Sequence, residues 1–389
     1  MSFFNKKDKK KIIAIFDIGS STVGSAMVEV SNNKNTHPTI IAFVRTDINH
    51  KKDINYENLS TDMFEALSIN ANELYNKKIG APKNIICVLA SPWYETQTKT
   101  IKNSRDTPFL FDEKNISELL KKEITANEIL NKEKFGENPD IPEIFEKNIL
   151  NISLNGYQVT NPIGKKVNSV DLGIIVSSSP GSFLSSLKSI FEKVFHETPV
   201  EFSSFVLDSF LAIRDRYSEL DSYMMVDIGG DVTDITIIKN NAIAKIASFP
   251  FGRKTLLSTI STKLDISLRD ASELFRLYNS NSMAENLKTK MSSLMKNIEE
   301  SYAESFYESI NNEDKPITVA NPLFLTVETN SNIFFVNLLQ KQEKIKSLFY
   351  NNICTVVSLE NKDFSDICKV KNTNCDPFLM IESIAYTKK

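Results

Sequence analysis

Ile15-Phe16-Asp17-Ile18-Gly19-Ser20-Ser21-Thr22 has a counterpart later in the chain, Val226-Asp227-Ile228-Gly229-Gly230-Asp231-Val232-Thr233-Asp234. Both segments place Asp-Ile-Gly directly after an apolar run. Glycine is scarce here, with 11 in 389 residues, so its position inside both segments is informative. Because glycine tolerates positive φ and lets other atoms approach the backbone, the two segments predict two tight turns that another group can approach closely.

The flanks of the two turns repeat as well. Apolar runs predict strands at 11–16, 23–30 and 40–44 around the first turn, and at 223–226, 235–238 and 242–249 around the second. A three-strand unit that occurs twice indicates an internal duplication, because each unit needs its own packed sheet. The chain is also long enough for two cores. The sequence therefore predicts an α/β protein of two lobes about a cleft.

Helices are predicted between the strand units. Apolar stripes at helical spacing run through 59–74 and 287–310. We interpret both as lobe helices that pack on a sheet, although the second could instead serve a partner helix. The polar stretch 133–149, with Gly136, Pro139 and Pro142, is interpreted as a loop inside an inserted subdomain.

Composition excludes several classes of protein. A net charge of -3 provides no field for phosphate backbones, so we expect no nucleic-acid partner. The four cysteines never approach a CxxC spacing, which argues against structural zinc. No stretch has the roughly 18 to 20 apolar residues of a spanning helix, so a cytoplasmic location is expected. Residues 1–10 are interpreted as a basic flexible tail.

The two turns carry the chemistry that we expect. Backbone N–H groups and the hydroxyls of Ser20, Ser21 and Thr233 can donate to phosphate. The carboxylates of Asp17 and Asp227 can hold a hydrated magnesium ion. A single Asp-Ile-Gly is also explained as an ordinary hairpin turn. The paired occurrence with matching flanks favours a phosphate clamp.

The paired turns resemble the two phosphate motifs of the actin, sugar-kinase and heat-shock-chaperone ATPase superfamily. Within it, the chain is most similar to FtsA and PilM. Three further segments resemble that family: 154–164 the end of the inserted subdomain called 1C or SHS2, 249–253 a strand-to-helix step, and 272–276 a nucleotide-contacting helix.

The resemblance implies a two-lobed actin-like (ribonuclease-H-like) fold with duplicated mixed sheets and an inserted 1C/SHS2-like subdomain. We expect lobe 1 at 11–90, 173–218 and 374–389, the inserted subdomain at 91–172, and lobe 2 at 219–373.

The resemblance also assigns roles to residues, with ATP and Mg²⁺ as the implied cofactors. Asp17 and Asp227 would hold the magnesium through water molecules, and Asp208 would lie near the attacking water. The residues implied to bind nucleotide are Gly19, Ser20, Ser21, Gly229, Gly230, Thr233, Glu273 and Arg276.

Three positions depart from the family pattern. Asp231 replaces a glycine in the second turn and adds a negative charge beside a negative ligand. Val327 and Glu328 replace a double glycine under the adenosine. A branched side chain there occupies space that glycine leaves free. These departures predict weak, magnesium-dependent binding and at most slow hydrolysis.

Three functions remain open from the sequence. The first is a nucleotide-binding scaffold that recruits or polymerises with components of cell division or type IV pilus assembly. The second is a pseudo-ATPase adaptor with a degenerate site, and the third is a sugar-kinase-like phosphotransferase. For the first two we expect protein partners, a contact surface on the inserted subdomain, and a location at the inner face of the membrane through a membrane-bound partner.

Overall fold

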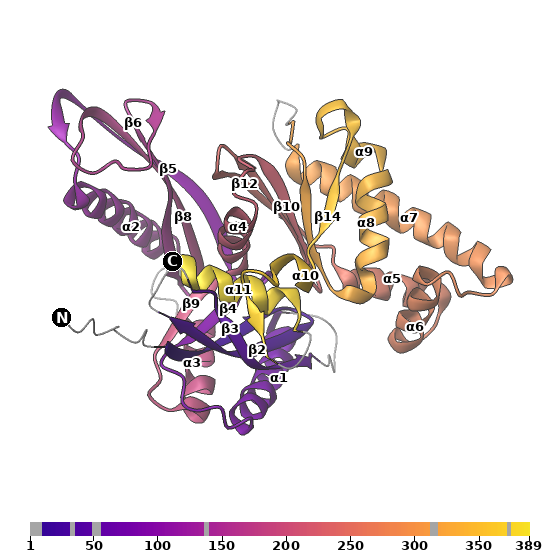
Figure 1. Cartoon of the computed structure of the whole chain (residues 1–389). Helices are drawn as coiled ribbons and strands as arrows, with labels where there is room; N and C mark the ends of the chain where they lie inside the picture. The colour runs from indigo at the N-terminus through magenta and orange to yellow at the C-terminus, as the bar shows by residue number, and fades with distance from the viewer. Residues whose placement is uncertain (1–9, 32–35, 49–55, 136–139, 312–317, 372–374) are drawn as a thin grey trace, which may run out of the picture.

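Three mixed or antiparallel β-sheets with flanking helices make up the chain (Figure 1). The structure is a computed structural model that describes residues 10–31, 36–48, 56–135, 140–311, 318–371 and 375–389. Most of the expected tail, residues 1–9, lies outside the described residues. Lys10 is the first residue of β1.

Lobe 1 is a six-stranded sheet in the order β15-β3-β2-β1-β4-β9. Its strands are β1 (Lys10–Ile18), β2 (Thr22–Ser31), β3 (Thr39–Asp47), β4 (Ile85–Leu89), β9 (Val200–Ser204) and β15 (Lys369–Val370). Helices α1 (Tyr56–Asn76) and α3 (Gly181–Phe195) pack together on one face, and α4 (Phe205–Arg216) and α11 (Pro377–Lys388) on the other. Lobe 1 is thus a sheet between two helical layers.

Lobe 2 has a five-stranded sheet in the order β12-β11-β10-β13-β14. Its strands are β10 (Tyr223–Ile228), β11 (Thr233–Lys239), β12 (Ala242–Phe249), β13 (Leu323–Val327) and β14 (Val356–Ser358). The helices are α5 (Arg253–Leu264), α6 (Leu268–Asn279), α7 (Glu285–Ile310), α8 (Asn332–Lys341) and α9 (Glu343–Lys346). The short helix α10 (Asn361–Phe364) follows β14 but contacts α11, and its Phe364 lies in the core of lobe 1. Successive side chains of β10 point to opposite faces of the sheet. Tyr223 and Met225 therefore join the core of lobe 1, and Met224 joins that of lobe 2.

The duplication predicted from the two turns is confirmed. In each lobe the first strand of the unit pairs antiparallel with the second and parallel with a later strand. Asp17 pairs with Gly24 in β2, and Asp227 pairs with Asp234 in β11. Both aspartates therefore occupy the carboxyl ends of equivalent central strands, where a parallel neighbour leaves room for a site.

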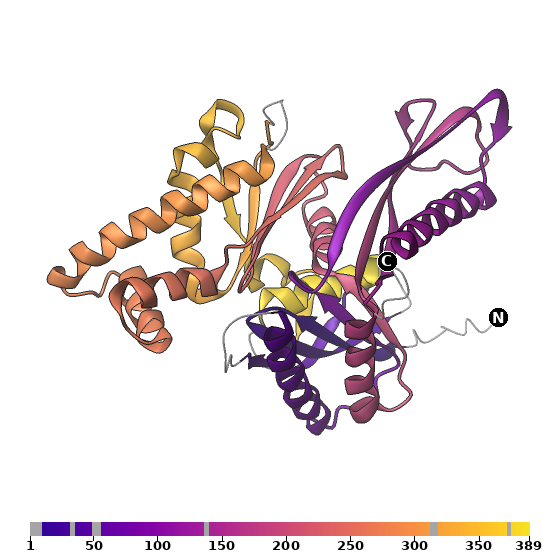
Figure 2. The same cartoon turned by 180° about the vertical axis from the view of Figure 1, so that it is seen from behind.

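A third unit is inserted after β4. Its four-stranded antiparallel sheet has the order β5-β8-β6-β7 and its own apolar core, on which α2 packs (Figure 2). The elements are β5 (Glu95–Leu110), α2 (Glu113–Phe135), β6 (Pro142–Leu154), β7 (Tyr157–Gln158) and β8 (Lys166–Pro180). The predicted loop at 133–149 is wrong at both ends, because α2 continues to Phe135 and β6 begins at Pro142. Proline is tolerated at the first position of a strand, where its missing N–H is not needed. Residues 136–139 lie outside the described residues.

The sheets also divide the chain differently from the ranges expected from the sequence. The limit at 172 falls inside β8, whose residues up to Pro180 pair with β6. Strand β15 pairs with β3 and so belongs to the lobe 1 sheet, although the sequence had placed it in lobe 2. The length of a strand such as β8, and the sheet that a short strand such as β15 joins, depend on the pairing partners. Hydrophobic periodicity does not reveal these partners.

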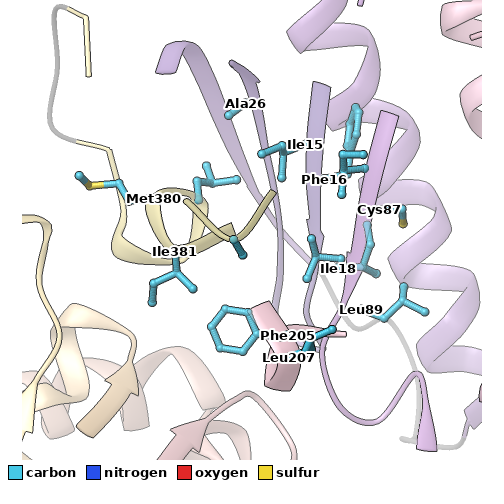
Figure 3. Packing of buried hydrophobic residues seen from close by; sticks show 14 of the residues in the cluster. Ile15, Phe16, Ile18, Ala26, Cys87, Leu89, Phe205, Leu207, Met380 and Ile381 are labelled. Carbon is cyan, nitrogen blue, oxygen red and sulfur yellow. The ribbon is translucent and has the colours of Figure 1, made fainter. Parts of the chain in front are cut away.

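The lobe 1 core positions the first turn. Phe16, the residue before Asp17, is fully buried, and its ring centroid lies 4.7 Å from that of Phe191 on α3. Figure 3 shows Phe16 and Ile18 among packed side chains of the same core, with Leu207 of α4 and Ile381 of α11 nearby. A rigid core under β1 thereby fixes where the turn begins.

The Phe16→Ala variant should lower the free energy of unfolding of lobe 1 by about 3–5 kcal/mol, because it leaves a cavity beneath the turn. Trp93 is the single tryptophan and lies in the same core, so its fluorescence in urea reports this transition. The control is Tyr157→Ala, at a side chain that is 77% exposed, with a change within about 0.5 kcal/mol. Equal effects of the two variants would contradict the packing described.

Candidate functional site

A cavity of about 230 Å³ lies where the two turns meet. The ends of β1 and β10, one from each lobe, and the start of α11 line it. The predicted residues that line it are Asp17, Gly19, Ser20, Ser21, Asp227, Gly229 and Gly230. Val327 and Glu328, at the positions of the expected double glycine, line it too. The structure therefore brings both turns and two of the departures into one site.

The two turns touch each other directly. The backbone N–H of Asp231 donates to Oγ of Ser20 at 3.1 Å. A Cβ added to Gly230 would lie 2.7 Å from Oγ of Ser20 and nearer still to Oγ of Ser21. Only glycine at position 230 permits this approach, since a real Cβ atom essentially never comes so close to another heavy atom. The hydroxyls of one turn thus pack against the backbone of the other.

Helix α5 supports the second turn from behind. The backbone N–H groups of Arg253 and Lys254 donate to the carbonyls of Gly229 and Gly230, at 3.0 and 2.8 Å. A Cβ on Gly252 would lie 2.6 Å from the carbonyl oxygen of Gly229, so the helix start also needs glycine. The first N–H groups of a helix have no partner within it. Here they fasten the turn instead of remaining available to a ligand.

Arg45 occupies the side of the first turn. Its guanidinium pairs with Asp17 at 2.8 Å and with Asp376 at the start of α11 at 3.0 Å, and it donates to Oγ1 of Thr22 at 2.7 Å. A Cβ at Gly24 would lie 2.8 Å from its Cζ, so the guanidinium fills the space beside that glycine. Burial raises the pKa of Asp17, although Arg45 opposes the shift. Asp17 is therefore already bound to a cation of the protein.

Asp227 lies at the end of β10, and no cation is among the groups that shift its pKa. Its Oδ1 accepts a hydrogen bond from Oγ1 of Thr326 at 2.7 Å. Burial raises its pKa to about 8, helped by the negative charges of Asp234 and Asp17, while the Thr326 hydrogen bond works against the shift. At neutral pH this carboxyl is therefore mostly protonated, which makes it a poor magnesium ligand.

Four predicted site residues lie away from the cavity. Thr233 is buried and donates to the carbonyl of Phe251 at 2.6 Å. Asp208 is buried in the first turn of α4, where it pairs with Nζ of Lys389 at 2.6 Å. Glu273 and Arg276 are more than half exposed and pair with each other on α6 at 2.5 Å. The structure does not bring these four residues to the turns.

Sequence reasoning missed Arg45, Lys254 and Asp376. Arg45 follows the apolar run 40–44 directly, so a charge at the end of a central strand was the available signal. Lys254 follows the segment 249–253 that resembles the family's strand-to-helix step. The resemblance places residues 374–389 in lobe 1, but nothing in the sequence indicates that Asp376 pairs with Arg45 on β3.

No family model matches the sequence, and neither does any curated protein. A solved structure from the PilM-PilN type IV pilus biogenesis complex matches with a TM-score of 0.61 and 12% identity, over 97% of this chain and 97% of that one. The chain has the two-lobed actin-like fold.

Two more solved structures match at lower TM-scores. The ethanolamine utilization protein EutJ from Carboxydothermus hydrogenoformans has a TM-score of 0.42 and 11% identity, over 98% of this chain and 90% of that one. A protein with an actin-like ATPase fold from Bacteroides thetaiotaomicron has a TM-score of 0.35 and 14% identity, over 69% and 81%.

The residues of this actin-like chain do not fit a magnesium-bound triphosphate. Five carboxyl groups but only two guanidinium groups line the cavity, the latter on Arg45 and Arg253. Both guanidinium groups are paired, Arg45 as described and Arg253 with Glu328 at 2.8 Å. Oγ of Ser21 and Nε of Arg253 have no hydrogen-bond partner here, but a triphosphate also needs unpaired cations, and the excess charge of the lining is negative.

The expected adenosine side borders a second cavity of about 1170 Å³, which Val327 and Thr329 line together with Arg45 and Asp376. Strand β13 ends at Val327, which is 6% exposed in the lobe 2 core. Beyond it, Nδ2 of Asn279, the last residue of α6, donates to the carbonyl of Asn330 at 3.0 Å. The helix that the resemblance assigns to the nucleotide is therefore fastened to the segment after β13.

The Asp227→Asn variant tests the electrostatics of the site. The folded-state pKa of Asp227 is about 8, whereas an unfolded Asp titrates at about 3.9. The wild type should therefore lose stability as the pH rises from about 4 to about 8, by at most about 1.4 kcal/mol per pH unit from this group. Asparagine keeps the acceptor for Thr326 but cannot ionise, so the variant should lack this loss.

Urea unfolding of both proteins across that pH range measures the difference in their free energies of unfolding. It should grow in favour of the variant up to about pH 8 and then level off. A difference that does not change with pH would show that Asp227 is ionised in the folded protein.

Proposed function

We propose that the chain is an actin-like adaptor that holds protein partners and does not depend on ATP turnover. The direct contact between Ser20 and the second turn carries this proposal. In an ATPase of this fold, the resemblance assigns the hydroxyls and N–H groups of the turns to phosphate. Here Oγ of Ser20 instead accepts from the N–H of Asp231, and the nearby cations are paired with carboxylates.

Type IV pilus assembly is the process that we propose for the adaptor. The structural match with a TM-score above 0.5 comes from the PilM-PilN type IV pilus biogenesis complex and spans nearly the whole of both chains. In the described part of the chain, no helix combines the length and apolar character needed to cross a membrane. We therefore propose that a membrane-bound pilus component recruits the chain from the cytoplasm to the inner face of the membrane.

The tip of the inserted subdomain is the proposed partner surface. Leu110 is 60% exposed, Tyr157 77% and Ile163 47%. The backbone N–H of Gly164 donates to the carbonyl of Phe111, which brings the loop of Ile163 beside the end of β5. Exposed aromatic and aliphatic side chains on a rigid sheet are typical of protein contacts.

A nucleotide-binding scaffold is the second candidate. Seven of the residues that the resemblance assigns to phosphate or magnesium line one cavity, which favours this function. It would require the turns to separate and Arg45 to leave Asp17. A sugar-kinase-like phosphotransferase has less support, because Asp208 is enclosed by Lys389 and Ser203.

Calorimetry with ATP and Mg²⁺ separates the two candidates. We expect no binding heat at concentrations up to about 1 mM, because no unpaired cation lines the described cavity. The Asp227→Ala variant should behave in the same way. Micromolar affinity in the wild type that this variant loses would instead establish the nucleotide-binding scaffold.

Complementation in the native host tests the adaptor. Deletion of the gene should abolish surface pili, and a copy with Asp227→Asn should restore them, since the proposed role needs no magnesium ligand. A copy with Leu110→Ser, Tyr157→Ser and Ile163→Ser should be folded, by circular dichroism, and fail to restore them. Pili in the deletion strain would refute the pilus role, and failure of the Asp227→Asn copy would refute the adaptor.

A further inference from the structure

Lys254 of lobe 2 reaches across to lobe 1. It lies in the first turn of α5, and its Nζ donates to the backbone carbonyl of Ser20 in the first turn of lobe 1. The same Nζ pairs with Oδ2 of Asp231 at 3.1 Å. The side chains of Lys254 and Asp231 are only 15% and 20% exposed. One ammonium group therefore joins both turns at a largely enclosed point.

The position of Lys254 has no explanation within its own helix. A cation in the first turn of a helix meets the positive end of the helix macrodipole, which is unfavourable. Burial by itself lowers the pKa of Lys254, and Asp231 opposes that shift. Both costs are offset by groups outside α5, namely the carboxylate of Asp231 and the carbonyl of Ser20.

Asp231 completes the connection from the other side. Its carboxylate holds Lys254, and its backbone N–H donates to Oγ of Ser20. The sequence marked Asp231 as a departure, because a negative charge opposes a phosphate at that point. The same carboxylate is favourable if the group that fills this point is an ammonium ion of the protein.

We propose that Lys254 and Asp231 form a built-in interlobe lock, which joins the two turns through Ser20 and holds the lobes closed without a ligand. The lock rests on the proposed function, in which no nucleotide bridges the lobes. A closed, fixed arrangement of the lobes is what a scaffold needs, because a partner that contacts both the inserted subdomain and lobe 2 then meets one geometry.

The neighbouring ion pair of Arg253 and Glu328 does not join the two lobes. Arg253 opens α5 and Glu328 follows β13, so both groups belong to lobe 2. The hydrogen bond from Oγ of Ser91 to Oδ1 of Asp234, at 3.0 Å, also joins the lobes, but it involves neither Ser20 nor Asp231. Lys254 is the cation that connects the turns themselves.

Amide hydrogen exchange of the full-length protein tests the lock. In Lys254→Met, which keeps a long unbranched stem, exchange of the Asp231 amide and of residues 19–21 should rise about tenfold or more, given the strength of hydrogen bonds to charged groups. Exchange in β6 of the inserted subdomain should stay unchanged. The matched control is Lys296→Met on α7, whose lysine is 75% exposed, and it should leave the turns as they are.

Asp231→Asn provides a second, independent variant. It should raise exchange at residues 19–21 in the same way, and combining it with Lys254→Met should add little, because both changes remove one interaction. Unchanged exchange at the turns in both single variants would overturn the lock. An equal rise throughout the chain would also overturn it, since Lys254 would then support the fold as a whole.

Adding ATP and Mg²⁺ to Lys254→Met separates the lock from the proposed function. If nucleotide restores protection at the turns, the lock stands and the proposal that the site does not accept nucleotide fails. If the turns open and nucleotide has no effect, both proposals stand. If calorimetry finds tight ATP binding to the wild type while Lys254→Met leaves exchange unchanged, both fail.

Discussion

The contact between Ser20 and the backbone of the second turn determines how the rest of the structure is arranged. Two equivalent strands, β1 and β10, end at turns that are held together by the N–H of Asp231 and by the missing side chain of Gly230. Each strand is fixed in a packed core, and side chains of lobe 2 such as Tyr223 and Met225 belong to the core of lobe 1, so this contact and the shared packing together set the relation of one lobe to the other. It also limits the space between the turns to a cavity of about 230 Å³.

Ion pairs near the two turns add to this contact. Phosphate sites of proteins depend on free N–H groups and unpaired cations. Here Arg45 is held by Asp17 and Asp376, and Lys254 by Asp231, so the cations near the turns stabilise the protein itself. In the proposed adaptor, the actin-like fold is kept and these charged groups serve closure. Fold and activity separate readily in this way, because activity resides in a few side chains of the site.

The inserted subdomain is fastened to lobe 1 by a buried polar contact. Glu146 on β6 is 5% exposed and accepts from Oγ of Ser203 at 3.0 Å and from the N–H of Ser204 at 3.2 Å. Burial raises its pKa, and the charge of Lys389 opposes the shift. A buried carboxyl satisfied in this manner favours one orientation of the subdomain. The exposed tip with Tyr157 therefore projects from a defined base, which suits a surface for protein partners.

The sequence by itself determined the duplication, the strands around both turns, and seven of the residues that line the cavity. These features are local, since periodicity and glycine placement follow from the backbone conformation of each segment. Tertiary structure alone decided which side chains close the site. Arg45 pairs with Asp376 and Lys254 contacts Ser20, and these partners lie far apart in the chain, so both contacts depend on how the sheets and α11 are placed. It likewise placed Glu273 and Arg276 on an exposed helix face, because a local motif does not specify which way its helix packs.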